Sequence, residues 1–201
     1  MIAPRGGPIG VILAGGIGRR IGGAKALAQL QGRPLIEYPL EALRSVLADV
    51  AVIAKPDTEL PSLPGVTIWI EPPEPRHPLT GITEALARAD GRAVVVCATD
   101  LPFVSPAVIE RLARHPVPRA PVVVAGLGEE IQPLLCCYHP GAAALLSAAA
   151  AEGRRPLREV VREIEPHVLL VEDPDVLFNI NSPEDLVKAA AMLARRGASR
   201  R

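Results

Sequence analysis

The stretch VILAGGIGRRIGGAKAL, residues 11–27, changes within a few positions from an apolar run to glycines, arginines and a lysine. An apolar run that ends at glycine predicts a buried β-strand. Glycine lacks a Cβ, so its backbone can adopt left-handed angles and bring N–H groups close to an anion. Arg19, Arg20 and Lys25 add positive charge at the same place. The stretch therefore predicts a loop that suits a triphosphate better than an uncharged ligand.

Two familiar phosphate-binding motifs do not fit this loop. The Walker motif requires Gly-Lys-Ser/Thr in succession, whereas residues 23–26 are GAKA. The dinucleotide fingerprint requires G-x-G-x-x-G, and Ile21 occupies its last position. A plain strand-to-helix turn rich in glycine is the structural alternative to a binding loop.

Composition limits the classes of protein to consider. The chain has 201 residues, of which 49% are hydrophobic, and this is enough for a sizeable core. Its formal net charge is +0, so we expect neither nucleic-acid nor membrane partners. No apolar run approaches the ~18 residues of a transmembrane helix, and the amino terminus lacks the apolar segment of a secretory signal. The cysteines, Cys97, Cys136 and Cys137, make a poor disulfide framework, so we expect a cytoplasmic protein.

Apolar runs alternate with segments of helical periodicity along the rest of the chain. The predicted strands are Gly10–Ala14, Val50–Ala54, Val66–Ile70, Ala93–Cys97, Val122–Ala125, Leu134–Tyr138 and His167–Val171. The predicted helices are Pro34–Leu47, Thr80–Ala89, Pro106–Arg114, Gly141–Ala151, Pro156–Ile164 and Ser182–Arg196. Within the first helix, Pro39 should produce a kink or delay the true start. This alternation predicts an α/β fold, a single three-layer α/β/α domain over residues 1–201 with a mainly parallel sheet. Its core spans about residues 9–193, and residues 195–201 form a mobile tail.

Asp100 follows directly after the strand predicted to end at Cys97. Ligands of parallel α/β sheets bind at the carboxyl ends of the strands, which is where the glycine loop also lies. Mg²⁺ prefers oxygen ligands and is commonly held by one or two carboxylates together with substrate phosphates. The sequence thus predicts that Asp100 holds Mg²⁺ beside the loop; an ordinary turn or capping aspartate is the alternative.

The loop fits the pattern L-A-G-G-x-x-x-R-[IM]-G-x-x-K and resembles the signature of sugar-nucleotide and molybdenum-cofactor nucleotidyltransferases. Its matching residues are Leu13, Ala14, Gly15, Gly16, Arg20, Ile21, Gly22 and Lys25. Thr99-Asp100-Leu101-Pro102-Phe103 is similar to the family element C-D-x-P-F, with threonine in place of cysteine. The segment HPLTGI, residues 77–82, is similar to G-P-L-x-G-I of the molybdenum cofactor guanylyltransferases. His77 is either a ligand or a solvated loop residue.

Three further elements complete the resemblance to this MobA-like family. Residues 178–186, FNINSPEDL, resemble its closing element, which contains Asn179 and Asn181. Glu71 stands where the family has an aspartate near the nucleotide, and Gln132 echoes a segment beside the substrate pocket. One departure concerns the base: the family has an asparagine after the second strand, where it contacts guanine, and this chain has Lys55 and Pro56 there.

The resemblance implies a Rossmann-like nucleotidyltransferase that moves GMP from Mg-GTP to molybdopterin and releases pyrophosphate. Catalytic roles fall to Arg20, Lys25 and Asp100, with Asp100 also the metal ligand. Nucleotide contacts are implied for Leu13, Ala14, Gly15, Gly16, Lys25, Glu71 and Asp100. Contacts to the acceptor substrate are implied for Asn181, Asn179, Gly22 and Gln132. Transient contact with molybdoenzyme-maturation proteins would follow from the same role.

Three other functions stay open at this stage. The missing asparagine allows a cytidylyltransferase that uses CTP and acts on molybdopterin or another phosphorylated small molecule. A non-catalytic nucleotide-binding domain is possible, but binding alone seldom needs a metal carboxylate such as Asp100. Hydrolysis instead of transfer would call for a positioned base, and the sequence offers no obvious one.

Overall fold

The computed structural model describes residues 6–16, 25–116, 121–153 and 155–198. Arg19, Arg20 and Gly22, all predicted for the site, lie outside the described residues, as do residues 199–201 of the predicted tail. The strands of the central sheet are β1 (Ile9–Leu13), β4 (Val50–Ala54), β5 (Thr67–Ile70), β6 (Val94–Ala98), β7 (Val122–Leu127), β8 (Glu130–Tyr138) and β9 (His167–Leu170).

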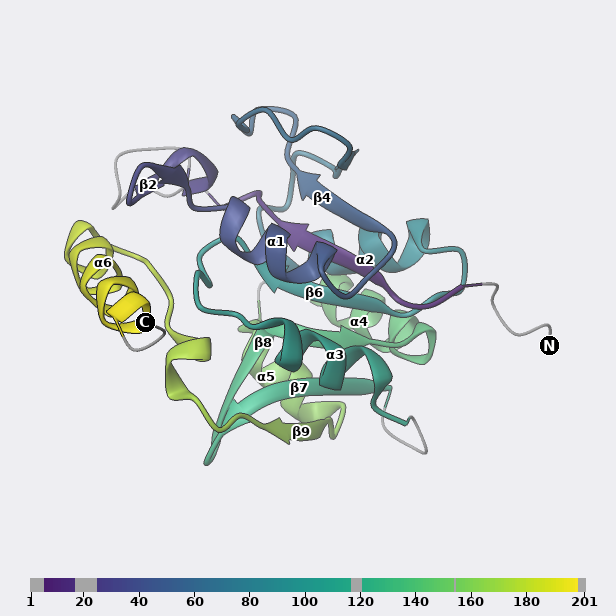
Figure 1. Cartoon of the computed structure of the whole chain (residues 1–201). Helices are drawn as coiled ribbons and strands as arrows, with labels where there is room; N and C mark the ends of the chain where they lie inside the picture. The colour runs from purple at the N-terminus through teal and green to yellow at the C-terminus, as the bar shows by residue number, and fades with distance from the viewer. Residues whose placement is uncertain (1–5, 17–24, 117–120, 154, 199–201) are drawn as a thin grey trace.

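Within the described residues these seven strands form one sheet in the order β5-β4-β1-β6-β8-β7-β9 (Figure 1). The first four are parallel to one another. The long strand β8 runs antiparallel to both of its neighbours, and β7 pairs in parallel with β9. The prediction of an α/β fold with a mainly parallel sheet is therefore confirmed. Every residue of β6 is buried, as expected for a strand covered on both faces.

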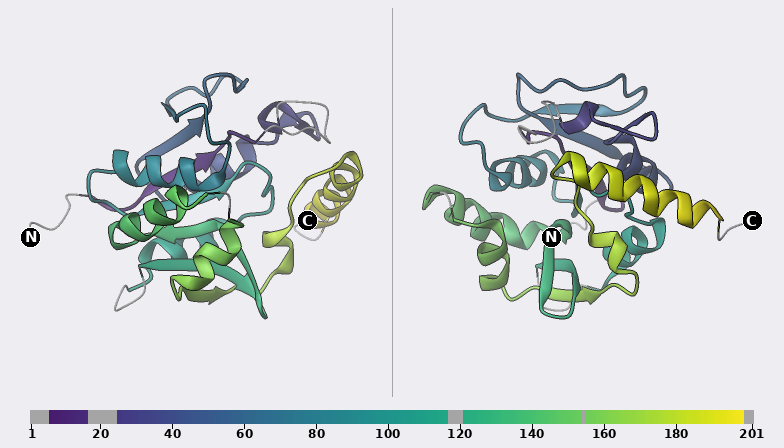
Figure 2. Two further views of the ribbon diagram at one scale, coloured as in Figure 1. Left: turned by 180° about the vertical axis from the view of Figure 1, so that it is seen from behind. Right: turned by 90° about the vertical axis from the view of Figure 1, so that its left-hand side faces the viewer.

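Helices cover both faces of the sheet (Figure 2). On one face, α1 (Glu37–Arg44) and α3 (Pro106–Arg114) pack on a core that includes Ile12, Val52 and Val95. On the other face, α2 (Pro78–Arg88), α4 (Ala143–Ala151) and α5 (Leu157–Glu163) pack on Val11 and Val96. Residues 11 and 12 point to opposite faces because strand side chains alternate. The result is the predicted three-layer arrangement.

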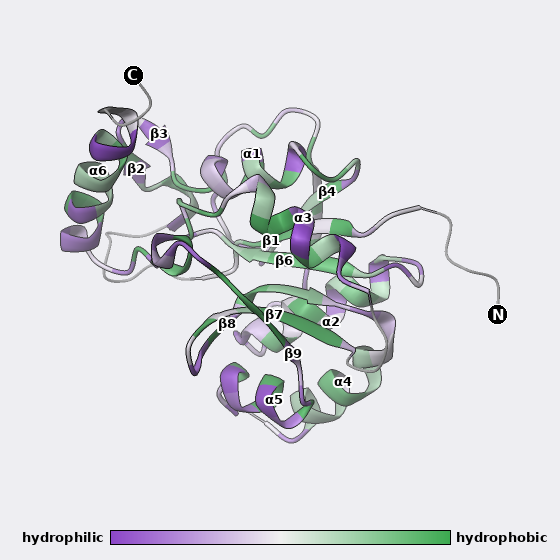
Figure 3. Ribbon diagram, turned by 60° about the horizontal axis from the view of Figure 1, so that its bottom comes forward, coloured by the Kyte–Doolittle hydropathy of each residue, from purple (hydrophilic) through white to green (hydrophobic). Residues whose placement is uncertain are grey.

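The last helix, α6 (Pro183–Ala198), lies outside these layers, beside the hairpin of β2 (Gln29–Leu30) and β3 (Arg33–Pro34) (Figure 1). Leu30, Leu35, Phe103, Ile180 and Ala189 form a small separate core there. Hydrophilic residues alternate with apolar ones along α6, whereas the central strands are mostly apolar (Figure 3). Three short 3-10 helices, η2 (Lys25–Leu27), η3 (Pro140–Ala142) and η4 (Pro174–Leu177), connect elements in the described chain. None of the described helices has the length and apolar character needed to cross a membrane.

The helix predicted over residues 34–47 is shorter than expected, and the prediction that it begins at Pro34 is wrong. Pro34 belongs to β3, because Gln31 and Gly32 adopt positive φ angles of 50° and 76° and close a hairpin turn. The helix begins at Glu37, so Pro39 is its third residue. The first four N–H groups of a helix have no partner within it, so proline costs little at that position. Pro39 thus marks a delayed start, one of the two predicted outcomes.

The turn predicted over residues 126–130 is also shorter than expected. Strand β7 continues to Leu127 and β8 begins at Glu130, so only Gly128 and Glu129 connect them. Gly128 has a φ of 59°, which glycine accepts without strain at the tip of a two-residue hairpin. Strand β8 therefore starts four residues before the predicted Leu134. The other predicted strands and helices agree with the structure to within about three residues, and β4 and α3 agree at both ends.

Candidate active site

The carboxyl ends of β1, β4, β5 and β6 meet at one edge of the sheet and border a cavity of about 380 Å³. The described residues for which the sequence predicted nucleotide contacts all line this cavity: Leu13, Ala14, Gly15, Gly16, Lys25, Glu71 and Asp100. Residues separated by up to 87 positions in the sequence, from 13 to 100, therefore share one wall. This placement follows the general rule that ligands bind at the carboxyl ends of parallel strands.

The start of the glycine loop offers fewer backbone donors than expected. The N–H of Ala14 donates to Ile53 O at 2.8 Å and so belongs to the sheet. Among the described loop residues, the donors left for an anion are the N–H groups of Gly15 and Gly16. A Cβ at Gly15 would lie 2.7 Å from Glu71 Oε1, whereas a Cβ at Gly16 would meet open space. A side chain at residue 15 would therefore displace the Glu71 carboxylate, whereas one at residue 16 would not.

Lys25, Asp100 and Asn181 come together from the beginning, middle and end of the chain. The ammonium of Lys25 forms an ion pair with Asp100 and donates to Asn181 Oδ1 at 2.8 Å. The Lys25 and Asp100 side chains are 17% and 9% exposed, so both border the cavity without being sealed off. The backbone supports this contact, because the N–H of Ile180 donates to Asp100 O at 3.0 Å.

Helix α6 holds Asn181 in place through a cap at its N-terminus. Asp185 Oδ2 accepts hydrogen bonds from the N–H groups of Asn181 and Ser182, at 3.0 and 3.1 Å. In return, the N–H of Asp185 donates to Ser182 Oγ at 3.2 Å. This reciprocal pair is the capping box that the sequence SPED predicted. The backbone hydrogen bonds also lower the pKa of the Asp185 carboxyl.

The other two described residues that the sequence predicted to contact the acceptor substrate, Asn179 and Gln132, form a separate pair. Gln132 Nε2 donates to Asn179 Oδ1 at 2.7 Å, and Gln132 Oε1 accepts from the N–H of Leu134 at 3.3 Å. Leu134 is the member of this group that lines the cavity. Asn179 and Asn181 therefore have different partners, and Asn181 alone contacts the Lys25 and Asp100 pair.

Thr99, which follows β6, and His77, which precedes α2, both have structural roles. Thr99 Oγ1 donates to Leu13 O at 3.0 Å and so ties the Asp100 turn to the start of the glycine loop. His77 is the N-cap of α2, where its Nδ1 accepts from the N–H of Leu79 at 3.2 Å. Both residues also line the cavity. His77 thus caps a helix, a role that differs from the ligand and the solvated loop residue that the sequence left open.

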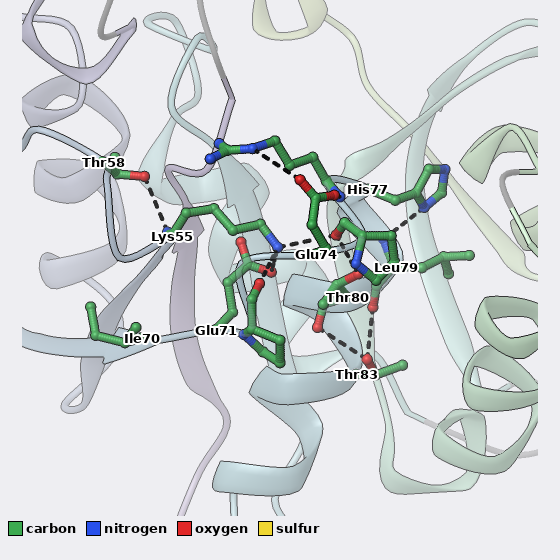
Figure 4. Close-up of polar contacts among 12 residues, drawn as sticks. Lys55, Thr58, Ile70, Glu71, Glu74, His77, Leu79, Thr80 and Thr83 are labelled. Atoms are coloured by element: carbon green, nitrogen blue, oxygen red, sulfur yellow. Dashed lines mark hydrogen bonds and ion pairs between the residues drawn. The ribbon is translucent and has the colours of Figure 1, made fainter.

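Lys55 is a cavity residue that the sequence did not predict as a ligand or support. Its side chain is 2% exposed, and its ammonium lies 3.2 Å from Glu71 Oε2 (Figure 4). Burial raises the pKa of the Glu71 carboxyl, and the charge of Lys55 opposes that shift. The sequence showed only that the family's asparagine is absent at this position, and this did not predict the contact between Lys55 and Glu71.

The cysteines take no part in the cavity chemistry. Cys97, Cys136 and Cys137 are buried in β6 and β8, and burial raises the pKa of the Cys137 thiol to about 12. Such thiols stay protonated near neutral pH and are poor nucleophiles. Within the described residues, no group of three or more His, Cys, Asp or Glu side chains could hold a metal ion. A metal at this site would therefore need ligands from its substrate as well.

Known proteins resemble both the sequence and the fold. Residues 10–168 match the family described as the MobA-like NTP transferase domain. The chain is 32% identical over 193 residues to the molybdenum cofactor guanylyltransferase of Desulfosudis oleivorans, covering 92% of this chain and 95% of the relative. It is 29% identical over 184 residues to the enzyme of that name from Vibrio cholerae, covering 90% and 91%.

Two solved structures show how far the likeness of fold extends. The molybdopterin-guanine dinucleotide biosynthesis protein A from Archaeoglobus fulgidus has a TM-score of 0.75 at 26% identity, covering 93% of this chain and 99% of that one. The 2-C-methyl-D-erythritol 4-phosphate cytidylyltransferase from Thermus thermophilus has a TM-score of 0.67 at 22% identity, covering 92% and 98%. The second likeness concerns the fold alone.

Proposed function

The chain belongs to the MobA-like NTP transferase family and is a nucleotidyltransferase; from that premise we propose that it transfers GMP from Mg-GTP to molybdopterin. The observation that carries the proposal is the convergence of Lys25, Asp100 and Asn181 at the edge of a cavity that follows the parallel strands. A cation, a carboxylate and a neutral amide at such an edge suit a triphosphate, a divalent metal ion and a polar acceptor.

The reaction needs positioning and charge neutralisation more than covalent catalysis. A terminal phosphate oxygen of molybdopterin attacks the α-phosphorus of GTP and forms a new P–O bond. The bond between the α-phosphorus and the bridging oxygen breaks, and pyrophosphate leaves with that oxygen. No general base is required, because the attacking phosphate is already an anion.

Lys25 is the described cation best placed to offset charge on the phosphates. Its ammonium has three donors, and the contacts to Asp100 and Asn181 occupy two of them. The N–H groups of Gly15 and Gly16 supply further donors at the end of β1. Arg20 is proposed to act with Lys25 on the developing charge, on the strength of the sequence motif alone.

The residues present fit a magnesium ion held mainly by its substrate. Asp100 places one carboxylate in the cavity wall, and its side chain is 9% exposed. Mg²⁺ commonly takes one or two protein carboxylates and completes its shell with phosphate oxygens and water. Asp100 would hold the ion, which when bound supplies charge neutralisation and orientation of the phosphates. The Lys25 ammonium balances the Asp100 charge in the protein itself.

The acceptor is proposed to bind on the α6 side of the cavity. Asn181 contacts Lys25, and the paired amides of Asn179 and Gln132 lie along the same closing segment and strand β8. Neutral amides can donate to a phosphate or to the polar atoms of a pterin without adding charge. Gly22 is proposed as a further acceptor contact from the sequence motif.

A cytidylyltransferase is the second candidate, and the absence of an asparagine directly after β4, where Lys55 stands, is the observation that keeps it open. The residue stands where the sequence resemblance places the asparagine that contacts guanine. Use of CTP in place of GTP would change the product but not the roles of Lys25 and Asp100. Base preference therefore has to be measured separately from the transfer reaction.

Pyrophosphate release tests the proposal. The purified protein is incubated with Mg-GTP or Mg-CTP, each with and without molybdopterin, and pyrophosphate is measured. We expect release that requires molybdopterin and is faster with GTP. Release at the same rate without an acceptor would contradict transfer and indicate hydrolysis, and faster release with CTP would replace the guanylyl assignment.

A further inference from the structure

Lys55 is buried in the cavity wall, with 2% of its side chain exposed. It follows directly after β4, at the same edge of the sheet as the glycine loop. A buried ammonium is strongly unfavourable unless acceptors surround it. The contacts of Lys55 therefore reveal what the residue stabilises.

The acceptors of the Lys55 ammonium all come from segment 71–75, which follows β5. Its Nζ donates to Pro72 O at 2.6 Å and to Pro75 O at 3.1 Å, and lies 3.2 Å from Glu71 Oε2 (Figure 4). Two of its three donors thus serve backbone carbonyls of one segment. Lys55 fastens this segment to the end of β4 and is not directed at a ligand.

The carboxylate of Glu71 keeps an unused acceptor. Its side chain is 6% exposed, and it lines the same cavity. Among the described residues, Oε2 of Glu71 is the one buried side-chain nitrogen or oxygen without a hydrogen-bond partner. The Lys55 ammonium is close enough to this oxygen for an ion pair, but the contact does not have the geometry of a hydrogen bond. A buried acceptor of this kind calls for an N–H or O–H donor from a ligand.

Two neighbouring glycines leave room for that carboxylate. A Cβ at Gly15 would be 2.7 Å from Glu71 Oε1, and a Cβ at Gly81 would be 3.4 Å from Oε2. The backbone of Glu71 is also held, because its N–H donates to Ala54 O at 3.0 Å. The ion pair with Lys55 and this backbone hydrogen bond therefore hold the carboxylate in the space beside the glycines.

Resting on the proposed function, we propose that Lys55 is a positioning residue that sets base specificity, by holding the Glu71 carboxylate where it accepts hydrogen bonds from guanine. Guanine presents two neighbouring donors, N1–H and the 2-amino group, which match the acceptors of a carboxylate. Adenine has an acceptor at N1, and cytosine has one amino donor beside an acceptor at N3. A fixed carboxylate therefore favours guanine and repels the acceptor atoms of the other two bases.

Inosine triphosphate isolates this contact, because it differs from GTP only by lacking the 2-amino group. Dissociation constants for Mg-GTP and Mg-ITP are measured by calorimetry on the wild type and on Glu71→Gln. A charge-assisted hydrogen bond corresponds to about tenfold to a hundredfold in affinity. We expect the wild type to bind GTP tighter than ITP by that factor, and Glu71→Gln to reduce the ratio to less than about threefold.

Lys55→Met tests the positioning role through the same ratio. A merely structural role would weaken both nucleotides equally, whereas loss of positioning lowers the preference for GTP over ITP. Lys55→Met combined with Glu71→Gln removes both charges, so this double variant still tests base reading by the carboxylate if Lys55→Met alone does not fold. Arg88→Met is the matched control: Arg88 donates to Ile70 O, at the end of β5 and directly before segment 71–75, but its side chain is 41% exposed on α2. We expect it to retain the wild-type ratio.

Several results would overturn the inference. If Glu71→Gln or the double variant kept the wild-type ratio of GTP affinity to ITP affinity, the carboxylate would not be the group that contacts the base. A ratio near one in the wild type, with weaker binding of 2′-deoxy-GTP, would assign Glu71 to the ribose instead. Tighter binding of Mg-CTP than of Mg-GTP would also contradict it, while transfer itself would stand. The proposed function fails differently, if the wild type binds no Mg-nucleotide and releases no pyrophosphate.

Discussion

Two lysine–carboxylate pairs line one cavity, and they differ in how far solvent and ligand can reach them. The side chains of Lys25 and Asp100 are 17% and 9% exposed, whereas those of Lys55 and Glu71 are 2% and 6% exposed. Lys25 also contacts Asn181, on the segment before α6. Lys55 instead contacts the carbonyls of Pro72 and Pro75, in the wall of the cavity.

This difference in exposure indicates that one pair can take part in the reaction and that the other maintains the structure of the cavity wall. A more accessible pair can exchange partners with an incoming phosphate or metal ion, because its charges are never left without solvation. A sealed pair cannot do so, since separating it would strand a charge in a low-dielectric environment. We therefore assign turnover to Lys25 and Asp100, and the geometry and base preference of the pocket to Lys55 and Glu71. Four substitution experiments and one pH experiment test this division.

Asp100→Ala should have the largest effect. We expect turnover to fall by at least about 10³-fold, because the carboxylate proposed to hold the metal ion is lost and no group of three or more His, Cys, Asp or Glu side chains among the described residues could replace it. Circular dichroism and the thermal unfolding midpoint should stay close to those of the wild type. The control is Glu110→Ala, an exposed carboxylate on α3 that pairs with Arg114 and should leave turnover unchanged. Near-normal turnover of Asp100→Ala would show that the site is assigned wrongly.

Lys55→Met should mainly reduce stability. Breaking a buried pair by removing one partner typically costs about 3–5 kcal/mol, and we expect that loss in the free energy of unfolding measured with urea. Adding Glu71→Gln should recover most of it, because neither charge is then left alone. If Lys25→Met proves more destabilising than Lys55→Met, the contrast between the two pairs is incorrect.

Lys25→Ala should act mainly on the reaction. We expect turnover to fall by about 10²–10³-fold, the range for removal of one preorganised donor to developing charge. Nucleotide binding measured by calorimetry should weaken as well, because the ammonium no longer offsets phosphate charge. The matched change is Lys188→Ala, an exposed lysine on α6 that should alter neither quantity. Loss of stability without loss of turnover in Lys25→Ala would reverse its assignment.

Gly15→Ala and Gly16→Ala form a matched pair of one-methyl changes. The new Cβ at residue 15 would lie 2.7 Å from Glu71 Oε1, while the one at residue 16 meets open space. We expect Gly15→Ala to lower the free energy of unfolding by about 1–3 kcal/mol through overpacking. Gly16→Ala should stay within about 0.5 kcal/mol of the wild type. Equal effects on urea denaturation would mean that the buried pair is not as tightly enclosed as described.

Acid sensitivity should come from the opposite end of the sheet and have the smallest effect. Burial, and secondarily the charge of His115, lower the pKa of His139, which follows β8. A histidine with a lowered folded pKa contributes stability that is present above its ordinary value of 6.5 and is lost as the pH falls through the folded pKa. We expect the free energy of unfolding to decrease by about 1 kcal/mol or less from pH 7.5 to 5.5. His139→Gln should flatten that decrease, and an unchanged slope would exclude this histidine as its source.

The sequence predicted the elements with strong patterns and missed the short ones. Strand β4 and helix α3 were predicted at both ends, because a buried apolar run and a Ser-Pro helix start leave few alternatives. The hairpin of β2 and β3 has two residues per strand, too few to show any periodicity. Its turn was predicted, but Pro34 was then assigned to a helix that begins three residues later, at Glu37.

The candidate site divides in the same way. The motif order brought Lys25, Asp100 and Asn181 into one prediction, and the structure brings the same residues into contact. Lys55 entered only as the absence of an asparagine, although it is one of the chain's few lysines. Its role depends on carbonyl groups of a proline-rich segment whose path no periodicity reveals. Arg20 and Gly22 stay predictions from the motif, since they lie outside the described residues.

Transfer of a radioactive phosphate tests the central claim most directly. The wild type is incubated with molybdopterin and Mg-GTP labelled with ³²P at either the α- or the γ-phosphate, and the products are separated by chromatography. If Lys25 and Asp100 serve nucleotidyl transfer, the α-label appears in the pterin product and the γ-label in pyrophosphate. The γ-label on the acceptor, or its release as inorganic phosphate with no α-label transferred, would contradict the account.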